Sequence, residues 1–344
     1  MLNITTFLDS NSKHLDKDVL YNPTTGNKYN SREILSTISE IGRQIKDFGV
    51  KKGDRVIIYL NNSEEYLFSL FAIWRIGAIA IPTNRAYKSA EIEHIANDSE
   101  AKLMITDDTA KDLIDITTYI PKNVANFKDC EILSAEYTTQ EDLCQLQYTS
   151  GTTGHPKGAM LTHGNYFAAI YNECNAFSLK QDDVFLGIYP MAHVGISCSI
   201  SALNAACYYV MMEQFNIEEY LDLCEKEKVT VLTGMPPVIH TLTTMDAKEQ
   251  LKSVRGIISS GGPLHEKIWK DFHRIYQIPI INAYGLSESI GLGTGTVTRP
   301  DDYLKNDNPE SVGHPVSFSE VKIVDENNHS IILPKYEQGE VALR

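Results

Sequence analysis

Residues 148–158 have the sequence YTSGTTGHPKG, which follows a run of β-forming residues at Leu143–Thr149. Glycine lets backbone N–H groups approach an anion closely, and serine and threonine hydroxyls add donors without adding charge. The composition therefore predicts a strand followed by a loop that binds the phosphates of a nucleotide. The residues assigned to this role are Thr149, Ser150, Gly151, Thr152, Thr153, Gly154 and Lys157, of which Lys157 supplies a mobile positive charge.

The loop differs from the GxxxxGK[ST] pattern of P-loop NTPases, because Pro156 precedes Lys157 and Gly158 follows it. A standard P-loop enzyme is therefore disfavoured. Two alternatives stay open at this point. One is a surface loop rich in small polar residues, and the other is an unrelated phosphotransferase that would release ADP.

Helices and short apolar strands alternate on both sides of the loop. Upstream, Asn30 and Glu33 form a predicted capping box before a helix that ends at Gly49. Predicted strands follow at 55–60, 78–82 and 103–106, and beyond the loop at 184–189, 206–212, 229–233, 256–260 and 279–283. Such alternation is typical of parallel sheets covered by helices. We expect an α/β fold over residues 1–290, with two packed, mostly parallel sheets flanked by helices.

Residues 291–344 have a different pattern. Two segments, Ser319–Asp325 and Ser330–Leu333, alternate in polarity around Asn327-Asn328, which predicts a hairpin within a smaller β-rich subdomain. The chain ends at EVALR, residues 340–344, which resembles an unfinished strand. We therefore expect this subdomain to be truncated at its end.

Composition excludes several classes of protein. The chain has 344 residues and a formal net charge of −14, which argues against binding to nucleic acid. Arg75 interrupts the longest apolar run, Phe68–Pro82, and no signal peptide is found, so no integral membrane segment is expected. The six cysteines have no CxxC spacing, which favours the reducing cytoplasm over a zinc or disulfide role. The oligomeric state stays open, with a homodimer as one option.

The loop and its continuation, YTSGTTGHPKGAMLTHGN, resemble the phosphate-loop signature of adenylate-forming enzymes. This family includes acyl-CoA synthetases, aryl-CoA ligases, luciferases and the adenylation domains of peptide synthetases. Further segments match the family in the same order along nearly the whole chain, and the fatty-acyl-CoA ligases are the most similar members. The matching segments are IKDFGVKKGDRV (45–56), GAIAIPTN (77–84), PMAH (190–193), GGPL (261–264), NAYGLSE (282–288) and SVGHP (311–315).

The resemblance implies roles for the phosphate side of the site. Lys157 and Ser287 are expected to contact phosphates, and Glu288 is expected to hold Mg²⁺, which commonly needs only one or two carboxylates besides phosphate oxygens. Lys157, His193, Ser287 and Glu288 are the expected catalytic residues. By the same resemblance adenine lies on Gly261, Gly262 and Pro263, and Asn282 and Tyr284 frame its other side. Ala283 and Gly285 complete the expected nucleotide-binding residues.

The same resemblance places the acid substrate beside His193, which acts as an aromatic gate. The expected lining is His193, Val194, Gly195, Ile196, Met235, Pro236 and Gly285. Acetate-specific relatives carry tryptophan where this chain has Gly285, so an acid longer than acetate is favoured. Relatives that activate amino acids carry an aspartate after the gate, whereas residues 194–196 are uncharged, which disfavours an ammonium group.

These features predict ATP-dependent activation of a carboxylic acid as acyl-AMP, followed by transfer to CoA. A medium- or long-chain fatty acid is the first choice, which would place the protein in fatty acid metabolism. An aryl-acid CoA ligase, an acyl-AMP ligase that loads a carrier protein, and a binding module without turnover are the alternatives. Because the family's small C-terminal domain cannot be located before Arg344, we expect low activity from this chain.

Overall fold

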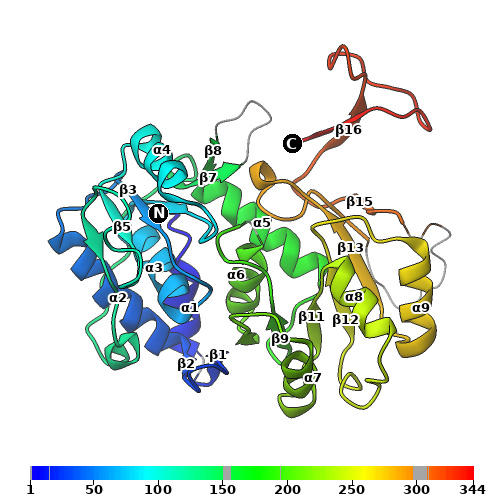
Figure 1. The fold of residues 1–344 in the computed structure, drawn as a ribbon, viewed down its shortest axis with the longest axis horizontal. Helices are drawn as coiled ribbons and strands as arrows, with labels where there is room; N and C mark the ends of the chain where they lie inside the picture. The colour runs from blue at the N-terminus through cyan, green and yellow to red at the C-terminus, as the bar shows by residue number, and fades with distance from the viewer. Residues whose placement is uncertain (1, 15, 150–155, 194, 297–307, 309) are drawn as a thin grey trace.

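A computed structural model describes residues 2–14, 16–149, 156–193, 195–296, 308 and 310–344. Within them, two large helix-flanked sheets lie side by side and a small hairpin projects from one end (Figure 1). The expected α/β class, with mostly parallel sheets followed by a smaller β-rich part, is confirmed. No helix among the described residues combines the length and the apolar character needed to cross a bilayer.

The first sheet has six strands in the order β6–β5–β3–β4–β7–β8. All neighbouring strands are parallel except β7 and β8, which form an antiparallel hairpin. The strands are β3 (Arg55–Ile58), β4 (Ile79–Pro82), β5 (Leu103–Ile105), β6 (Thr118–Tyr119), β7 (Leu143–Thr149) and β8 (Lys157–Thr162). The sequence pattern predicted β7 but missed β8.

The second sheet has nine strands in the order β15–β14–β13–β12–β11–β9–β10–β1–β2. Its centre is parallel, and antiparallel strands close both edges. The strands are β1 (Asp18–Tyr21), β2 (Lys28–Asn30), β9 (Val184–Gly187), β10 (Tyr208–Met211), β11 (Val231–Thr233), β12 (Gly256–Ser259), β13 (Ile280–Tyr284), β14 (Thr294–Gly295) and β15 (His314–Pro315).

Helices cover the sheets, and α2, α3, α5 and α7 each begin after a residue whose side chain accepts from a free N–H group of the first turn. Asn30 accepts from the backbone of Glu33, whose carboxylate accepts from the backbone of Asn30, so the predicted capping box is confirmed. Thr162 caps α5 in the same reciprocal way with Asn165. The helices are α1 (Thr6–His14), α2 (Ser31–Asp47), α3 (Glu64–Arg75), α4 (Ser89–Ser99), α5 (His163–Ala176), α6 (Ile196–Asn204), α7 (Ile217–Lys226), α8 (Pro236–Thr243) and α9 (Glu266–Tyr276), with short 3-10 turns η1 (Val124–Phe127) and η2 (Ser287–Ser289).

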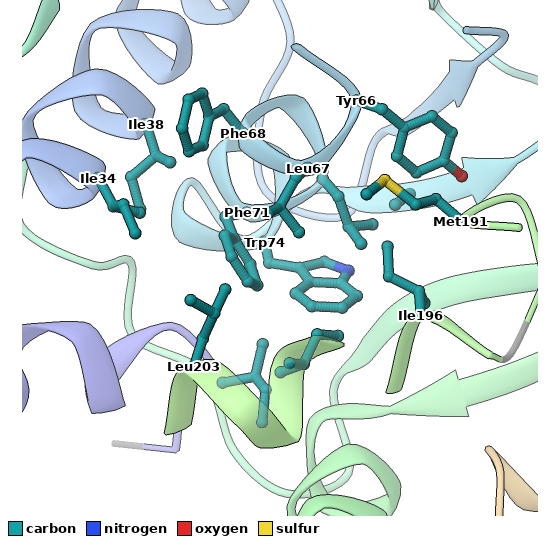
Figure 2. Packing of buried hydrophobic residues seen from close by; sticks show 14 of the residues in the cluster. Ile34, Ile38, Tyr66, Leu67, Phe68, Phe71, Trp74, Met191, Ile196 and Leu203 are labelled. Carbon is teal, nitrogen blue, oxygen red and sulfur yellow. The ribbon is translucent and has the colours of Figure 1, made fainter. Parts of the chain in front are cut away.

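A core cluster joins the two sheets around α3. Figure 2 shows Trp74 among side chains that come from α2, α3 and α6 and from the segment before α6. The indole N–H of Trp74 donates to the carbonyl of Cys144 at 2.8 Å, which ties α3 to β7. Met191 and Ile196 point into the same cluster, so both ends of the segment that carries His193 are anchored in the core.

Arg75 is buried at the end of α3, and its charge is neutralised by the N-terminal helix. Its guanidinium donates to both carboxylate oxygens of Asp9 at 2.9 Å, and its Nε donates to the carbonyl of Leu133 at 2.6 Å. The arginine that interrupts the apolar run 68–82 therefore links α3 to α1. This bidentate geometry is the strongest form of ion pair that arginine makes.

The C-terminal hairpin differs from its predicted pairing. β16 (Val321–Val324) pairs antiparallel with β17 (Glu340–Leu343) along its whole length, whereas the segment 330–333 makes a single bridge, from Ile332 to Val324. The predicted hairpin of Ser319–Asp325 with Ser330–Leu333 is therefore confirmed only in part. Two backbone hydrogen bonds flank that bridge, from Asp325 N–H to the carbonyl of Ile331 at 3.0 Å and from Leu333 N–H to the carbonyl of Ile323 at 2.8 Å, while the main ladder of β16 is made with β17. All four residues of β17 pair with β16, from Val321 opposite Leu343 to Val324 opposite Glu340. A longer loop than the predicted one therefore connects the two strands.

Candidate active site

The β7–β8 hairpin presents the two ends of the predicted phosphate loop. Thr149, the last residue of β7, is in register with Lys157, the first residue of β8. The ammonium of Lys157 is exposed and makes no ion pair within the described residues. The predicted binding residues Ser150, Gly151, Thr152, Thr153 and Gly154 lie outside the described residues.

Helix α4 contacts the loop end of this hairpin. The hydroxyl of Tyr148 donates to Asp98 at 2.6 Å, and the ring of His94 lies 3.3 Å from the carbonyl of Pro156. The Tyr148 ring also fills the space beside Gly158, where an added Cβ would lie 3.2 Å from it. Glycine at 158 thus lets the tyrosine pack directly on the hairpin.

The turn after β13 brings a second group of predicted residues to the hairpin. η2, which carries Ser287 and Glu288, packs against β7 and β8. The carboxylate of Glu288 is exposed and makes no hydrogen bond or ion pair with another described residue. Residues far apart in sequence, Lys157 and Glu288, are therefore carried by elements in direct contact, and both have free charged groups.

Glu288 offers one exposed carboxylate, which is compatible with a metal ion that a bound nucleotide helps to hold. No group of three His, Cys, Asp or Glu side chains among the described residues forms a preformed metal cage. Mg²⁺ is commonly held by one or two carboxylates together with phosphate oxygens and water. A single open carboxylate fits that mode, in which the nucleotide itself supplies the remaining oxygens.

The residues predicted to surround adenine lie at the ends of β12 and β13. Gly261, Gly262 and Pro263 are exposed, and Gly261 has a φ of +83° with open space where a side chain would be. They border a hollow of about 640 Å³ whose other walls are Met235, Pro236, Pro237, His240, Thr241, His265 and Ile268. On β13, Tyr284 is half-buried, while Ala283 and Asn282 are buried.

The Asn282 side chain points away from open space. Its amide donates to the carbonyl of Ser311 at 3.0 Å, and its backbone N–H donates to the hydroxyl of Thr296 at 2.8 Å. The amide is therefore engaged in fastening the β13–β15 region. Of the two residues predicted to frame the base on this side, Tyr284 is the more accessible.

The segment before α6 is fastened by two side-chain amides, one half-buried (Asn62) and one buried (Gln147). Asn62 donates to the carbonyl of Tyr189 at 3.1 Å and accepts from the N–H of Met191 at 2.8 Å. Gln147 donates to the carbonyl of Ala192 at 3.1 Å. Because Asn62 follows β3 and Gln147 lies on β7, the first sheet positions the loop that carries His193.

A chain of buried polar groups supports Gln147 in turn. The hydroxyl of Tyr166 donates to Gln145 at 2.9 Å, and the amide of Gln145 donates to Gln147 at 2.9 Å. Every member of such a chain must be satisfied, since an unpaired buried amide is costly. The two glutamines in this buried strand therefore have a structural role: Gln145 orients the amide of Gln147, which binds the carbonyl of Ala192.

His193 is held as a neutral imidazole. Its Nε2 lies 3.0 Å from the amide nitrogen of Asn84, whose oxygen accepts from the N–H of Ala86 at 2.8 Å. That second bond orients the Asn84 amide, so its nitrogen donates to the ring. Desolvation by the surrounding wall lowers the pKa of His193 below its ordinary value of 6.5, although the residue is exposed at one side.

His193 lies at a cavity of about 370 Å³, referred to below as the acid cavity. Five predicted residues line it, namely His193, Gly195, Met235, Gly261 and Gly285. Its other walls are Glu173, Tyr189, Pro190, Ser197, Cys198, Ser260, Gly291 and Leu292, which the sequence pattern did not indicate. Predicted residue Val194 lies outside the described residues.

Two predicted lining residues lie elsewhere. Ile196 is 0% exposed and packs in the core cluster of Figure 2, so we assign it to packing. Pro236 is buried and borders the neighbouring hollow of about 640 Å³. The position of Ile196 follows from helical periodicity. Ile196 is the first residue of α6 and its side chain points towards α3, whereas the next two residues, Ser197 and Cys198, line the cavity.

Gly285 is required by the backbone rather than by the size of a substrate. A Cβ at this position would lie 1.4 Å from the carbonyl oxygen of Gly291. The chain turns back on itself between these residues, so no side chain can enter without displacing the turn. The turn in this chain therefore requires glycine at 285, and the expectation that Gly285 also leaves room for an acid longer than acetate stays a prediction.

Glu173 is the most unexpected wall of the acid cavity. It is buried on α5 and accepts hydrogen bonds from two serines of α6, Ser197 at 2.5 Å and Ser201 at 2.7 Å. Burial raises the pKa of Glu173 from 4.5 to about 7, and the two serines oppose that rise. The sequence offered one sign of this role, an acidic residue within a helix of mostly apolar residues, 163–176. The serines that bind Glu173 lie more than twenty residues further along the chain, so no local motif connects them.

Comparison with known proteins identifies the family of the chain. The model of the AMP-binding enzyme family matches residues 7–344. A crotonobetaine/carnitine–CoA ligase of Escherichia coli O45:K1 is 26% identical over 92% of this chain and 65% of its own length. The 4-coumarate–CoA ligase 3 of Arabidopsis thaliana is 27% identical over 96% of this chain and 63% of its own length.

Solved structures share the fold. The ATP-bound crystal structure of MatB from Rhodopseudomonas palustris superimposes with a TM-score of 0.90 and 23% identity, over 100% of this chain and 70% of that one. The present chain spans 65% of the length of the Escherichia coli ligase. The match over residues 7–344 shows that the chain belongs to the AMP-binding enzyme family.

Proposed function

We propose that the protein activates a carboxylic acid with ATP, forming acyl-AMP and pyrophosphate, and that CoA then accepts the acyl group. The observation that carries this proposal is the turn between β13 and β14. Its residues Gly285 and Gly291 line the acid cavity, while η2 between them packs on the hairpin that carries Lys157. One short segment thus adjoins both the acid and the phosphates.

The first step requires no protein nucleophile. A carboxylate oxygen of the acid attacks the α-phosphorus of ATP, the bond from that phosphorus to the bridging oxygen breaks, and pyrophosphate leaves. Catalysis of this kind consists of positioning and charge stabilisation. Thr149, Lys157 and the loop 150–155 would hold the phosphates, with Ser287 donating to an α-phosphate oxygen.

Glu288 would hold the divalent ion. Mg²⁺ bound there with phosphate oxygens would offset the charge that develops on the leaving pyrophosphate. The exposed carboxylate on η2 supports this assignment. Gly261, Gly262, Pro263 and Tyr284 would contact the base, with Asn282 and Ala283 shaping that wall.

His193 would confine the acid rather than exchange protons with it. Its Nε2 accepts from Asn84, and its lowered pKa keeps the ring uncharged near neutral pH. A neutral ring at the cavity wall can pack against the acid without pairing with the reacting carboxylate. The carboxylate therefore stays available for attack on phosphorus.

The size of the acid cavity supports an acid of medium size. Small-molecule sites commonly occupy about 300–1,000 Å³, and the acid cavity, at about 370 Å³, is near the lower limit. Of the medium- and long-chain fatty acids expected from the sequence, this volume favours a medium-chain acid, and an aryl acid is the alternative supported by resemblance to the coumarate ligase. CoA as acceptor is supported by both curated relatives, with a carrier protein as the alternative.

Two further parts of the proposal rest on sequence. We place the protein in the cytoplasm on the basis of its cysteine usage, and we divide the chain into two α/β lobes over 1–290 and a β-rich subdomain over 291–344.

Product analysis tests the reaction class. The chain is incubated with ATP, Mg²⁺ and panels of fatty and aryl acids, and nucleotides are separated by chromatography. We expect AMP and pyrophosphate, and only with acid present. Release of ADP would support a phosphotransferase instead, and nucleotide binding without any acid-dependent product would support a binding module.

A further inference from the structure

Glu173 brings a carboxylate to the wall of a cavity that the sequence predicted to be uncharged. It lies in the second half of α5 and is 0% exposed. Together with Ser197, Cys198 and Gly291 it forms one side of the acid cavity. Glu173 is therefore part of the wall that a bound acid would touch.

No cation neutralises this carboxylate within the described residues. Its recorded partners are two neutral hydroxyls, those of Ser197 and Ser201. A buried carboxylate in apolar surroundings is unfavourable unless it is paired or well hydrogen-bonded. Raising its pKa to about 7 reduces that cost, because much of the population is then protonated at neutral pH.

The backbone makes room for the carboxylate at the acid cavity. A Cβ at Gly291 would lie 2.3 Å from Glu173 Oε1 and 2.8 Å from Ser197 Oγ. Gly291 has a φ of +79°, a conformation that favours glycine. The carboxylate oxygen is thus seated directly against the turn that also carries Gly285, which is the turn the proposed function assigns to the acid.

A purely structural link between α5 and α6 would not need a carboxylate. An amide or another hydroxyl could accept the hydrogen bonds of the two serines, and burying such a neutral group costs less free energy than burying a carboxylate. An ionised carboxylate accepts about four hydrogen bonds, and two of these positions are used by Ser197 and Ser201. Acceptor capacity therefore remains, beside the acid cavity.

We propose that the preferred acid carries a hydrogen-bond donor, a hydroxyl or an ammonium, on the part of its chain distant from the reacting carboxylate, and that Glu173 accepts a hydrogen bond from it. This inference rests on the proposed function and specifies its substrate class. It also removes the argument against ammonium-bearing acids, because the absence of charge at 194–196 is compensated by Glu173 on α5.

Binding of acyl-adenylate analogues tests the inference without requiring turnover. In these probes a sulfamate replaces the phosphate, and the acyl groups are 6-aminohexanoyl, 6-hydroxyhexanoyl and heptanoyl, which differ only in the terminal NH₃⁺, OH or CH₃. Homologues shorter and longer by two carbons allow for differences in reach. Affinities are measured by calorimetry for the wild type, Glu173→Gln and Glu173→Leu, with Glu225→Gln, an exposed glutamate of α7, as the matched control.

We expect one of the donor-bearing probes to bind the wild type at least about tenfold more tightly than its methyl counterpart. The reason is that a hydrogen bond to a charged group generally contributes this much to affinity. Glu173→Leu should reverse this order, Glu173→Gln should reduce it, and Glu225→Gln should retain it. Melting temperatures of the variants establish that each is folded.

Two results would overturn the inference. If all probes bind but the methyl probe is equal or better at every length, with the same order in Glu173→Leu, then Glu173 is a structural link only and the proposed function survives. If neither the probes nor 5′-sulfamoyladenosine nor ATP binds, the proposed function fails together with the inference.

Discussion

Gly285 and Gly291 approach so closely that a Cβ on Gly285 would lie 1.4 Å from the carbonyl oxygen of Gly291. This contact closes the turn that holds η2, and with it Ser287 and Glu288, against the β7–β8 hairpin. The same contact shapes one wall of the acid cavity. Turn geometry thus couples the phosphate side of the site to the acid side.

Substitution of Gly285 is therefore expected to damage both sides together. Gly285→Ala should lower the melting temperature and weaken binding of ATP and of acyl-adenylate analogues of every chain length, because the turn must open. Gly256→Ala is the matched control, since its Cβ would lie 3.8 Å from the nearest atom, an ordinary contact. A Gly285→Ala variant with unchanged stability that merely prefers shorter acids would contradict this account.

Stability should depend on pH through Glu173. Its pKa is about 7 in the folded chain and 4.5 ordinarily, so between these values the folded state binds more protons than the unfolded state. The contribution of Glu173 to the free energy of unfolding is therefore fully present below pH 4.5 and is lost as pH rises through 7. Urea midpoints from pH 4.5 to 7.5 should fall more steeply for the wild type than for Glu173→Gln.

Parallel pH profiles for the two proteins would show that Glu173 ionises normally in the fold. The comparison with Glu173→Gln is essential, because other groups titrate in the same range. His163 acts in the opposite direction, since burial lowers its pKa from 6.5 to about 4 and thereby lowers stability as pH falls. The difference between wild type and variant removes this shared contribution.

The Arg75–Asp9 pair should contribute to the docking of α1. Asp9→Asn leaves a buried guanidinium with a neutral partner, and we expect a loss of about 1–3 kcal/mol in the free energy of unfolding. The exposed pair of Lys122 and Asp108 serves as the control. Asp108→Asn should change the free energy of unfolding far less than Asp9→Asn does, because exposed ion pairs are screened by water. Equal effects in the two variants would contradict a special role for Arg75.

Nucleotide binding should depend on Lys157 and Glu288 in distinguishable ways. Lys157→Met is expected to lower the affinity for ATP at least about tenfold, with or without Mg²⁺, because a charge-assisted contact to the phosphates is removed. Glu288→Gln should weaken ATP only when Mg²⁺ is present. Calorimetric titrations of ATP in the presence of Mg²⁺ or of EDTA separate the two effects, and a Glu288→Gln variant that retains its full response to Mg²⁺ would exclude this carboxylate as a ligand.

Local sequence was sufficient for much of the fold. The helix that Asn30 and Glu33 begin, and the strand that ends at Thr149, could be predicted because their signals lie within a few residues. β8 could not, because Lys157–Thr162 becomes a strand only by pairing with β7. The hairpin partner of β16 was missed for the same reason, since its register is decided by residues in a distant segment.

The site shows the same limit. His193 and Gly285 were placed at the acid cavity by their motifs, whereas Ile196 was misplaced because the direction of a side chain depends on how α6 meets α3. Glu173 carried no motif at all. Its role follows from Ser197, Ser201 and Gly291, which only the packing of α5, α6 and the β13–β14 turn brings to it.

The most direct test of the central claim is a crystal structure of the chain with ATP and Mn²⁺, using the anomalous signal of manganese. We expect the triphosphate to contact the 149–158 hairpin, including Lys157, and the manganese peak to lie within ligand distance of Glu288. A nucleotide bound elsewhere, or a manganese peak away from Glu288, would contradict the account.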